Sequence, residues 1–373
     1  MPSLPLNGIR VVDLSRVLAG PFCSMTLGDL GAQVIKVERP GTGDETRGWG
    51  PPFDAEGQAA YFLSTNRNKL SVTVDFESKT DREFLVALIA GADVVVENFL
   101  PGVLVRNGID KGALVTSNVH LIWCTISGFG PDSMRPGYDF VVQAESGWMA
   151  ITGPEAGPPS KVGVALVDVM AGKDAAIAIL AAIAGRDRGT AANRHLTISL
   201  SGTAAAALVN VAQNSLVTGS DARRWGNAHP NLVPYQLFEA SDRPIVVAVG
   251  SDNQWKAAAT TLGLEALAND ERMRTNAGRL ENREEIVSAM SARIAERTAA
   301  EWMHRFTAAG IPCGQVRSVK EALQQADASP RTGVGSAVGG SVRLSPPRLG
   351  EHDELVRTFQ WSAFDHVPIL AST

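Results

Sequence analysis

Short β-branched runs alternate with helix-like segments through the first third of the chain. Residues 9–14 and 33–38 are rich in Val and Ile, and residues 20–31 between them carry apolar side chains at helical spacing. Because strands joined by a helical crossover lie parallel in one sheet, this order predicts a βαβ unit. The alternation continues with expected strands at 70–76, 93–97 and 120–126 and an expected helix at 81–90. The pattern predicts a doubly wound, Rossmann-like α/β domain.

The second half of the chain predicts a further part of this domain and then a smaller one. An Ala-rich helix is expected at 165–184, a strand at 196–200 and another helix at 202–215. A segment full of Gly, Asn and Pro at 223–235 predicts a crossing between domains. The small domain is expected to be α+β, with a strand at 244–249 and helices at 252–262, 281–296 and 299–309. The predicted limits are 1–222 for the first part of the large domain, 223–322 for the small domain with its linker, and 323–373 for a return to the large domain.

Composition excludes several classes of protein. The net charge of −5 offers no basic surface for nucleic acid. The three cysteines match neither a metal-site spacing nor a disulfide framework, so a reducing, cytoplasmic compartment is expected. No signal peptide and no apolar run of about 18 residues is evident, so no membrane partner is expected. The histidines include no pair at metal-ligand spacing, and no metal site is predicted.

The turn after the first predicted strand, residues 13–20, lies where a dinucleotide-binding fold carries its glycine fingerprint. Glycines at the required spacing are absent, which argues against NAD or FAD bound in the usual way. The N-terminus of the next helix still offers N–H groups that suit an anion or a carbonyl oxygen. Another phosphate-bearing ligand remains open.

An ordered set of motifs covers about residues 6 to 355. It includes "LNGIRVVDLSRVLAGPFCSMTLGDLGAQVIKVERPGTGDETRGWGPPF", "NRNKLSVTVDF", "DVVVENFLPG" and "KVGVALVDVMAGKDAA". This set resembles the class III CoA-transferase family of CaiB/BaiF type, which also contains formyl-CoA transferase and α-methylacyl-CoA racemase. Within the family, "RVLAGPF" and "RRWGNAHPNLVPYQLF" are most similar to the succinate–hydroxymethylglutarate CoA-transferase branch.

The resemblance implies an architecture and an activity. The implied architecture is a large CoA-binding domain and a small domain, assembled as an interlocked, ring-shaped homodimer whose active site lies between domains of different chains. The implied reaction moves CoA from an acyl-CoA, such as succinyl-CoA or another dicarboxylyl-CoA, to an acceptor carboxylate. CoA and acyl-CoA are then substrates, and no tightly bound cofactor is expected.

Asp168, in "GVALVDVMAG", matches the carboxylate that becomes acylated in this family. A carboxylate with an ordinary pKa of about 3.9 is ionised near neutral pH and needs no separate base to act as a nucleophile. Its attack on the thioester would give a mixed anhydride, and CoA thiolate would then convert the anhydride to an aspartyl-CoA thioester. The alternative interpretation is that Asp168 only caps the helix that follows.

Tyr138, in "GYDF", separates the transferases from the racemases of this family. The racemases carry a histidine here as one of two acid/base groups, whereas tyrosine, with a pKa near 10, is a poor proton acceptor at neutral pH. We therefore expect Tyr138 to donate its hydroxyl near the thioester, unless it is only a residue at the edge of the core. The alternative functions are an α-methylacyl-CoA racemase or epimerase and a non-catalytic CoA-binding protein.

The resemblance also implies residues that contact CoA and substrate. The expected CoA contacts are Val17, Leu18, Ala19, Arg39, Asn68, Lys69, Glu97, Asn98, Phe99 and Arg106. Arg39 and Arg106 have the chemistry to bind its phosphates, although each arginine taken alone would more often be a solvated surface charge. Leu18 replaces a glutamine of formyl-CoA transferase, which argues against oxalate and formate as substrates.

Four more residues are candidates for the acyl group. Arg47 and Arg67 could pair with the distal carboxylate of a dicarboxylic acid. Asn227 and His229 could reach the acyl pocket, and the alternative for His229 is a loop residue that orders a turn.

Overall fold

The computed structural model describes residues 4–190 and 193–370. The chain divides into two compact units, each with its own hydrophobic core. The first comprises Met1–Met149, Lys161–Ser220 and Ala326–Thr373, and the second comprises Ala150–Ser160 and Asp221–Gln325. Each unit is therefore built from separate stretches of sequence.

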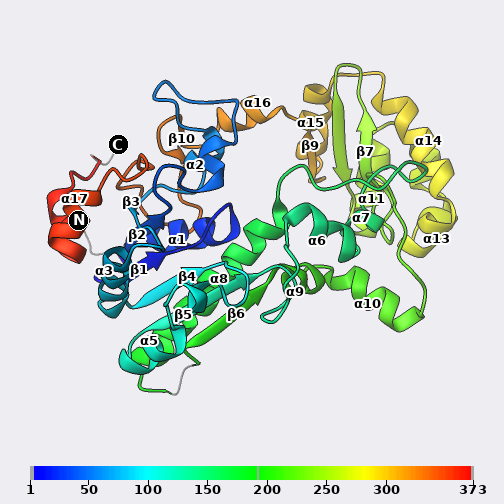
Figure 1. Ribbon diagram of the computed structural model, residues 1–373. Helices are drawn as coiled ribbons and strands as arrows, with labels where there is room; N and C mark the ends of the chain where they lie inside the picture. Colours follow the sequence, from blue (N-terminus) through cyan, green and yellow to red (C-terminus); the bar gives the residue numbers. More distant parts are fainter. Residues whose placement is uncertain (1–3, 191–192, 371–373) are drawn as a thin grey trace. The chain divides into compact units, whose positions relative to one another are not determined.

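The first unit is organised around a six-stranded parallel sheet (Figure 1). Its strand order is β3 (Lys69–Thr73), β2 (Gln33–Glu38), β1 (Arg10–Asp13), β4 (Val94–Glu97), β5 (Ile122–Ser127) and β6 (His195–Ser199). The α/β class and the parallel sheet predicted from the sequence are confirmed. Because the chain moves to one side of β1 with β2 and to the other with β4, the carboxyl ends of β1 and β4 mark the switch point where such sheets bind ligands.

Successive side chains of the strands face opposite layers of helices. Val11, Val34, Val94 and Ile122 pack with helices α1 (Ala19–Asp29) and α8 (Leu166–Asp187). Val12, Ile35, Leu70 and Val95 pack with α3 (Lys79–Ala90), α5 (Lys111–Ser117) and α17 (Asp353–Phe359). Burial on both faces explains the nearly continuous apolar runs of the strands.

Shorter elements complete this unit. They are η1 (Glu45–Gly48), α2 (Ala60–Leu63), α4 (Val103–Arg106), α6 (Asp139–Glu145), α9 (Leu200–Ala206), α10 (Val209–Thr218), β10 (Ala328–Ser329), β11 (Gly333–Val334) and η3 (Gln360–His366). The single helix expected at 202–215 is broken into α9 and α10, because Val209 adopts a φ of +43° where α10 begins. Helix α7 (Trp148–Ile151) leads from the first unit into the second.

The second unit combines a three-stranded antiparallel sheet with several helices. The sheet order is β7 (Tyr235–Glu239), β8 (Pro244–Ala248) and β9 (Cys313–Gln315). The helices are α11 (Asp252–Thr261), α12 (Glu265–Ala268), η2 (Glu271–Met273), α13 (Asn276–Glu281), α14 (Arg283–Ile294), α15 (Ala299–Ala308) and α16 (Val319–Leu323). The predicted strand and the three predicted helices are present as β8, α11, α14 and α15, whereas β7 and β9 were missed.

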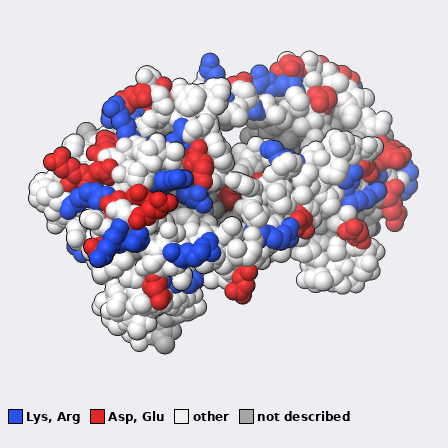
Figure 2. Space-filling model, in the orientation of Figure 1, with Lys and Arg blue, Asp and Glu red and all other residues white. Residues whose placement is uncertain are grey.

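The surface charges, the lengths of the helices and the arrangement of possible metal ligands were compared with the partners expected from the sequence. On the face shown in Figure 2, acidic and basic side chains are interspersed rather than gathered into one basic surface. Among the described residues, no helix is both long and apolar enough to cross a bilayer. The same residues contain no group of three or more His, Cys, Asp or Glu arranged to hold a metal ion.

Candidate active site

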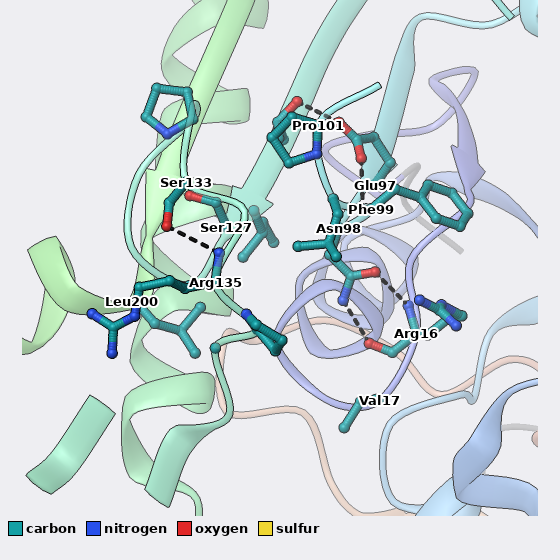
Figure 3. Close-up of a pocket in the computed structure, with 18 of the residues that line it drawn as sticks. Arg16, Val17, Glu97, Asn98, Phe99, Pro101, Ser127, Ser133, Arg135 and Leu200 are labelled. Atoms are coloured by element: carbon teal, nitrogen blue, oxygen red, sulfur yellow. Dashed lines mark hydrogen bonds between the residues drawn. The ribbon is translucent and has the colours of Figure 1, made fainter. Parts of the chain in front are cut away.

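A cavity of about 410 Å³ opens at the carboxyl ends of the central strands of the first unit (Figure 3). Its walls come from the turns that follow β1, β4 and β5 and from the start of α8. It is lined by both predicted catalytic residues and by six of the expected CoA contacts: Asp168, Tyr138, Val17, Leu18, Ala19, Glu97, Asn98 and Phe99. The fold thus brings together segments separated by up to half the chain at its topological switch point.

Asp168 lies in the first turn of α8 and is only 8% exposed. Burial raises its pKa, and the negative charge of Asp139 raises it further, to about 7. The helix N-terminus favours the ionised form, but these two effects outweigh it. The expectation of an ordinary carboxylate pKa was therefore wrong: near neutral pH, the free protein divides between the protonated and the ionised form of Asp168.

Asp139 supplies the cap that α8 lacks. Ala165 stands at the N-cap position of α8 and has no side chain to accept a hydrogen bond. The Oδ1 of Asp139 instead accepts from the backbone N–H groups of Val167 (2.8 Å) and Asp168 (3.3 Å). Its Oδ2 accepts from Nε2 of Gln143 at 2.6 Å. The role of Asp139 was not predicted from the sequence. Two features could have indicated it: its position next to Tyr138, and the lack of a residue before α8 whose side chain can cap a helix.

Tyr138 stands at the N-cap position of α6 and is 55% exposed. It lines the same cavity as Asp168. Within the described residues, its hydroxyl makes no intramolecular hydrogen bond, so it is free to donate to a ligand. Its role near the thioester stays a prediction.

The turn between β1 and α1 forms the wall that lies along α8. Val17 has a φ of +70°, a backbone conformation that β-branched residues rarely adopt. Leu18 and Ala19 follow it into α1 and are buried. A Cβ atom at Gly172, one turn after Asp168, would lie 2.5 Å from the carbonyl oxygen of Ala19. Gly172 therefore allows α1 and α8 to approach closely beside Asp168.

The turn after β4 forms the adjoining wall of the cavity. Asn98 bridges the backbone of Arg16, accepting its N–H at 3.0 Å and donating to its carbonyl oxygen at 2.8 Å (Figure 3). Glu97 is buried and accepts from the Phe99 N–H at 2.9 Å and from the hydroxyl of Thr125. The two turns are thus tied together by directional hydrogen bonds.

A second cavity, of about 560 Å³, adjoins the first. Arg39, Phe76 and Asn107 line it, and both cavities share Arg16, Glu45 and Phe99. Arg39 is exposed there and can contact an anion. Arg106 is exposed at the end of α4 but lines neither cavity.

A family model described as CoA-transferase family III matches residues 6–352. The chain belongs to this family. The succinyl-CoA:glutarate CoA-transferase of Mus musculus is 42% identical over 370 residues, which cover 93% of this chain and 84% of the relative. The succinate–glutarate CoA-transferase of Agrobacterium fabrum is 39% identical over 325 residues, 85% of this chain and 81% of the relative.

Among solved structures, a CaiB/BaiF family protein from Brucella suis matches with a TM-score of 0.83 at 38% identity. The match covers 95% of this chain and 99% of that structure. The resemblance seen in the motifs is confirmed as family membership, and the chain is a CoA-transferase by class.

Two of the residues expected to contact CoA lie in the interior of this CoA-transferase. Asn68 and Lys69 are fully buried. The Nζ of Lys69 donates to Asp13 (3.0 Å), to the carbonyl oxygen of Pro21 (2.9 Å) and to Asn66 (2.9 Å), and burial lowers its pKa to about 8. The side chain of Asn68 donates to Asp29 at 2.7 Å. Their contact with CoA stays a prediction, but it would require internal bonds to break.

The arginines expected to hold a distal carboxylate are already paired. Arg47 donates to both carboxylate oxygens of Glu38, at 2.8 and 2.7 Å. Arg67 donates to both oxygens of Asp29, at 3.0 and 2.7 Å. Neither arginine lines either of the two cavities. Their substrate role stays a prediction, and the geometry favours a structural one.

Asn227 and His229 belong to the second unit. His229 accepts at Nδ1 from the Asn231 N–H (3.0 Å), and its ring packs on Tyr235 with centroids 5.2 Å apart. These contacts agree with the alternative in which His229 orders a turn. Asn227 is exposed. The expectation that both reach the acyl pocket stays a prediction.

Tyr61 is a further residue near the site that the sequence did not single out. Burial raises its pKa, and the charges of Asp168, Asp139 and Asp44 raise it further. Trp49 packs edge-on against its ring at 5.1 Å. No local sequence signal marks Tyr61, because its proximity to Asp168 arises only from the tertiary fold.

Proposed function

We propose that the chain transfers CoA from a dicarboxylyl-CoA, such as succinyl-CoA, to an acceptor carboxylate, with Asp168 as the nucleophile. The observation that carries the proposal is the Asp168 carboxyl, buried at the start of α8 yet lining the cavity at the switch point of the sheet. The substrate class is supported by relatives named succinyl-CoA:glutarate and succinate–glutarate CoA-transferase.

The proposed reaction has four balanced steps. The ionised Asp168 oxygen attacks the thioester carbon, the C–S bond breaks, and CoA leaves as the thiolate. The thiolate attacks the aspartyl carbonyl of the resulting anhydride, and the first acid leaves as its carboxylate. The acceptor carboxylate then attacks the aspartyl-CoA thioester, the C–S bond breaks, and a second anhydride and CoA thiolate form. The thiolate attacks the acceptor acyl carbon of this anhydride, the C–O bond to Asp168 breaks, and Asp168 leaves as its carboxylate. Burial of Asp168 limits the access of water to these intermediates.

The two adjoining cavities suit the two ends of an acyl-CoA. We assign the thioester to the cavity that contains Asp168 and Tyr138, with the Tyr138 hydroxyl as a donor to the thioester region. We assign the nucleotide end to the cavity lined by Arg39, whose guanidinium would contact a phosphate. Phe99, shared by both cavities, would then lie along the pantetheine arm.

The assembly proposed with this function is an interlocked homodimer working in the cytoplasm. Helix α10 presents large apolar side chains to its surroundings: Val209, Leu216 and Val217 are 69%, 78% and 73% exposed. Exposed apolar side chains gathered on one helix support a partner surface of this kind. Free cysteines, two of them buried, agree with a reducing compartment.

The rival reaction is epimerisation of an α-methylacyl-CoA. The pKa of about 7 at Asp168 would suit an acid/base group. A second such group is required on the opposite side of the substrate, and Tyr138 is a poor one at neutral pH. Incubation of a 2-methylacyl-CoA in heavy water without an acceptor acid distinguishes the two, because only an epimerase incorporates deuterium at C2.

The direct test is to trap the intermediate. The protein is incubated with succinyl-CoA, quenched with hydroxylamine and digested, and the modified residue is located by mass spectrometry. We expect modification at Asp168 and loss of transfer in the Asp168→Ala variant. Asp174→Asn is the matched control on the same helix, since Asp174 accepts a hydrogen bond from Thr203 and lies outside the cavity. An active Asp168→Ala variant would refute the mechanism.

A further inference from the structure

The backbone of Val17 is strained at a place where the strain shapes the active site. Val17 has a φ of +70°, and the branched Cβ of valine makes that conformation costly. Such a residue keeps its conformation only where its surroundings impose it, and such sites cluster where function needs them. Val17 begins the segment that continues through Leu18 and Ala19 along the cavity wall shared with Asp168.

The restraint on Val17 comes from Asp44. The Val17 N–H lies 3.2 Å from each of the two carboxylate oxygens of Asp44. Asp44 is 1% exposed, and it is fixed in turn by Lys36, whose Nζ lies 3.0 Å from Oδ2, and by the N–H and hydroxyl of Thr46, at 3.0 and 2.8 Å from Oδ1. The carboxylate therefore cannot follow Val17 if the turn relaxes.

The same ion pair holds the other end of the turn. The Nζ of Lys36 also donates to the carbonyl oxygen of Ser15 at 2.9 Å. The segment from Ser15 to Val17 is thus bonded at both ends to one buried pair of charges. A well-packed apolar pair would serve stability as well as a buried ion pair does. What the ion pair adds is two directional bonds onto the β1–α1 turn.

We propose that Asp44 is a positioning residue for CoA transfer: through the Val17 N–H it holds the β1–α1 turn in the strained conformation that shapes the cavity wall beside Asp168. This inference rests on the proposed function. The residue acts through Val17, and its contribution depends on valine being unable to keep a positive φ unaided. Glycine keeps that φ without strain, so it should make the restraint dispensable.

The test compares two paired variants that both lack the buried charges. Lys36→Met with Asp44→Asn keeps a side-chain oxygen for the Val17 N–H, whereas Lys36→Met with Asp44→Ala removes it. Both avoid leaving a single unpaired charge in the interior. We expect kcat with succinyl-CoA and an acceptor acid to be about tenfold lower in the Ala pair than in the Asn pair, because the wall beside the nucleophile is misplaced.

Val17→Gly is then added to each pair. We expect the difference in kcat between the two pairs to fall below about threefold, because glycine at this φ needs no restraint. The difference in melting temperature should remain, since the Thr46 hydrogen bonds are still lost in the Ala pair. A purely structural role of Asp44 would leave both differences in place.

Two single variants complete the design. Val17→Gly with Asp44 intact gives the reference kcat for the two triple variants, because Val17 itself lines the cavity and its replacement can change kcat independently of Asp44. Gln360→Gly is the matched control, since Gln360 also has a positive φ, of +47°, and lies outside both cavities. It should leave kcat unchanged in every background.

The outcomes separate the inference from the function on which it rests. A kcat difference between the pairs that persists after Val17→Gly, or no kcat difference between the pairs, would each overturn the role of Asp44. An unmodified protein that transfers no CoA between acids would instead overturn the proposed function itself.

Discussion

The backbone N–H of Asp168 donates a hydrogen bond to the side chain of Asp139, with 3.3 Å between nitrogen and oxygen. The acceptor that completes the helix N-terminus is thus itself an anion placed beside the nucleophile. Burial is the larger cause of the raised pKa of Asp168, and the charge of Asp139 adds to it. One side chain therefore fixes the position of the nucleophile and also makes it more basic.

Replacing Asp139 should move the pH profile of the enzyme. Asp139→Asn keeps an oxygen for the α8 cap but removes the charge, so the pKa of Asp168 should fall by roughly one unit. Because the ionised form is the nucleophile, the acid limb of kcat/KM should move to lower pH by the same amount. The measurement is kcat/KM for succinyl-CoA between about pH 5 and pH 9. Asp187→Asn, at the far end of α8, is the control, and an acid limb unmoved by Asp139→Asn would contradict the argument.

Replacing Asp168 should stabilise the protein, and more so at higher pH. Its pKa is about 7 in the folded protein, against 3.8 ordinarily, so between these values the folded state binds the proton more tightly. Stability is therefore lost as pH rises from about 4 to 7, and Asp168→Asn escapes this loss. At about 1.4 kcal/mol per pKa unit, the rise from 3.8 to about 7 makes the gain above neutral pH on the order of 4 kcal/mol, and the gain should vanish near pH 4.

Urea unfolding of the Asp168→Asn variant at mildly acidic and mildly alkaline pH checks this prediction. Gly314→Ala, which alters no titratable group and meets no atom within 4 Å, is the control and should change stability equally at both pH values. A stability gain that is equal at both pH values would mean that the asparagine acts through packing rather than through the proton.

Adding a methyl group at Gly172 should separate α1 from α8. The new Cβ would lie 2.5 Å from the carbonyl oxygen of Ala19, so Gly172→Ala should cost about 1 to 3 kcal/mol of stability through overpacking. It should also lower kcat, because Asp168 lies on α8 and the β1–α1 turn leads into α1, so the substitution would move the two apart. Gly314→Ala, which meets no atom within 4 Å, is the control. Full activity of Gly172→Ala would show that the spacing of the helices is not critical.

Arg47→Met should distinguish a structural arginine from a substrate-binding one. The change leaves Glu38, which is 4% exposed, without its guanidinium partner, and breaking a buried pair typically costs about 3 kcal/mol or more. We expect a lower melting temperature but little change in KM for a dicarboxylic acceptor. Glu38→Gln added to Arg47→Met should recover part of the stability. A KM for dicarboxylic acids that rises while that for monocarboxylic acids does not would restore the substrate role of Arg47.

The fold could be predicted because its cause is local. Val11, Val34 and Val94 repeat in strands separated by helical segments, and burial on both faces demands such runs. The break between α9 and α10 could not be predicted in this way, because the positive φ of Val209 interrupts residues that otherwise favour a helix. Strands β7 and β9 were missed because their sequences carry only a short and partial alternation.

The site was predictable to the extent that motifs mark it. Asp168, Tyr138 and the segments 17–19 and 97–99 were all named from the sequence, and they line one cavity. The raised pKa of Asp168 was not predictable, because it depends on burial and on Asp139, which lies 29 residues away in the chain. The interior position of Lys69 was also missed, since a polar run such as "NRNK" normally indicates an exposed loop.

The pairing of Lys69 with Asp13 has a consequence for how chains of this kind can diverge. Both side chains are completely buried, so a neutral replacement of one residue leaves the opposite charge of the other without a partner in the interior. A substitution at only one of the two positions should therefore cause a large loss of stability. A substitution that is retained at one position requires a compensating substitution at the other. Across descendants of a common ancestor, the first and third strands of this sheet should therefore vary in step at these two positions.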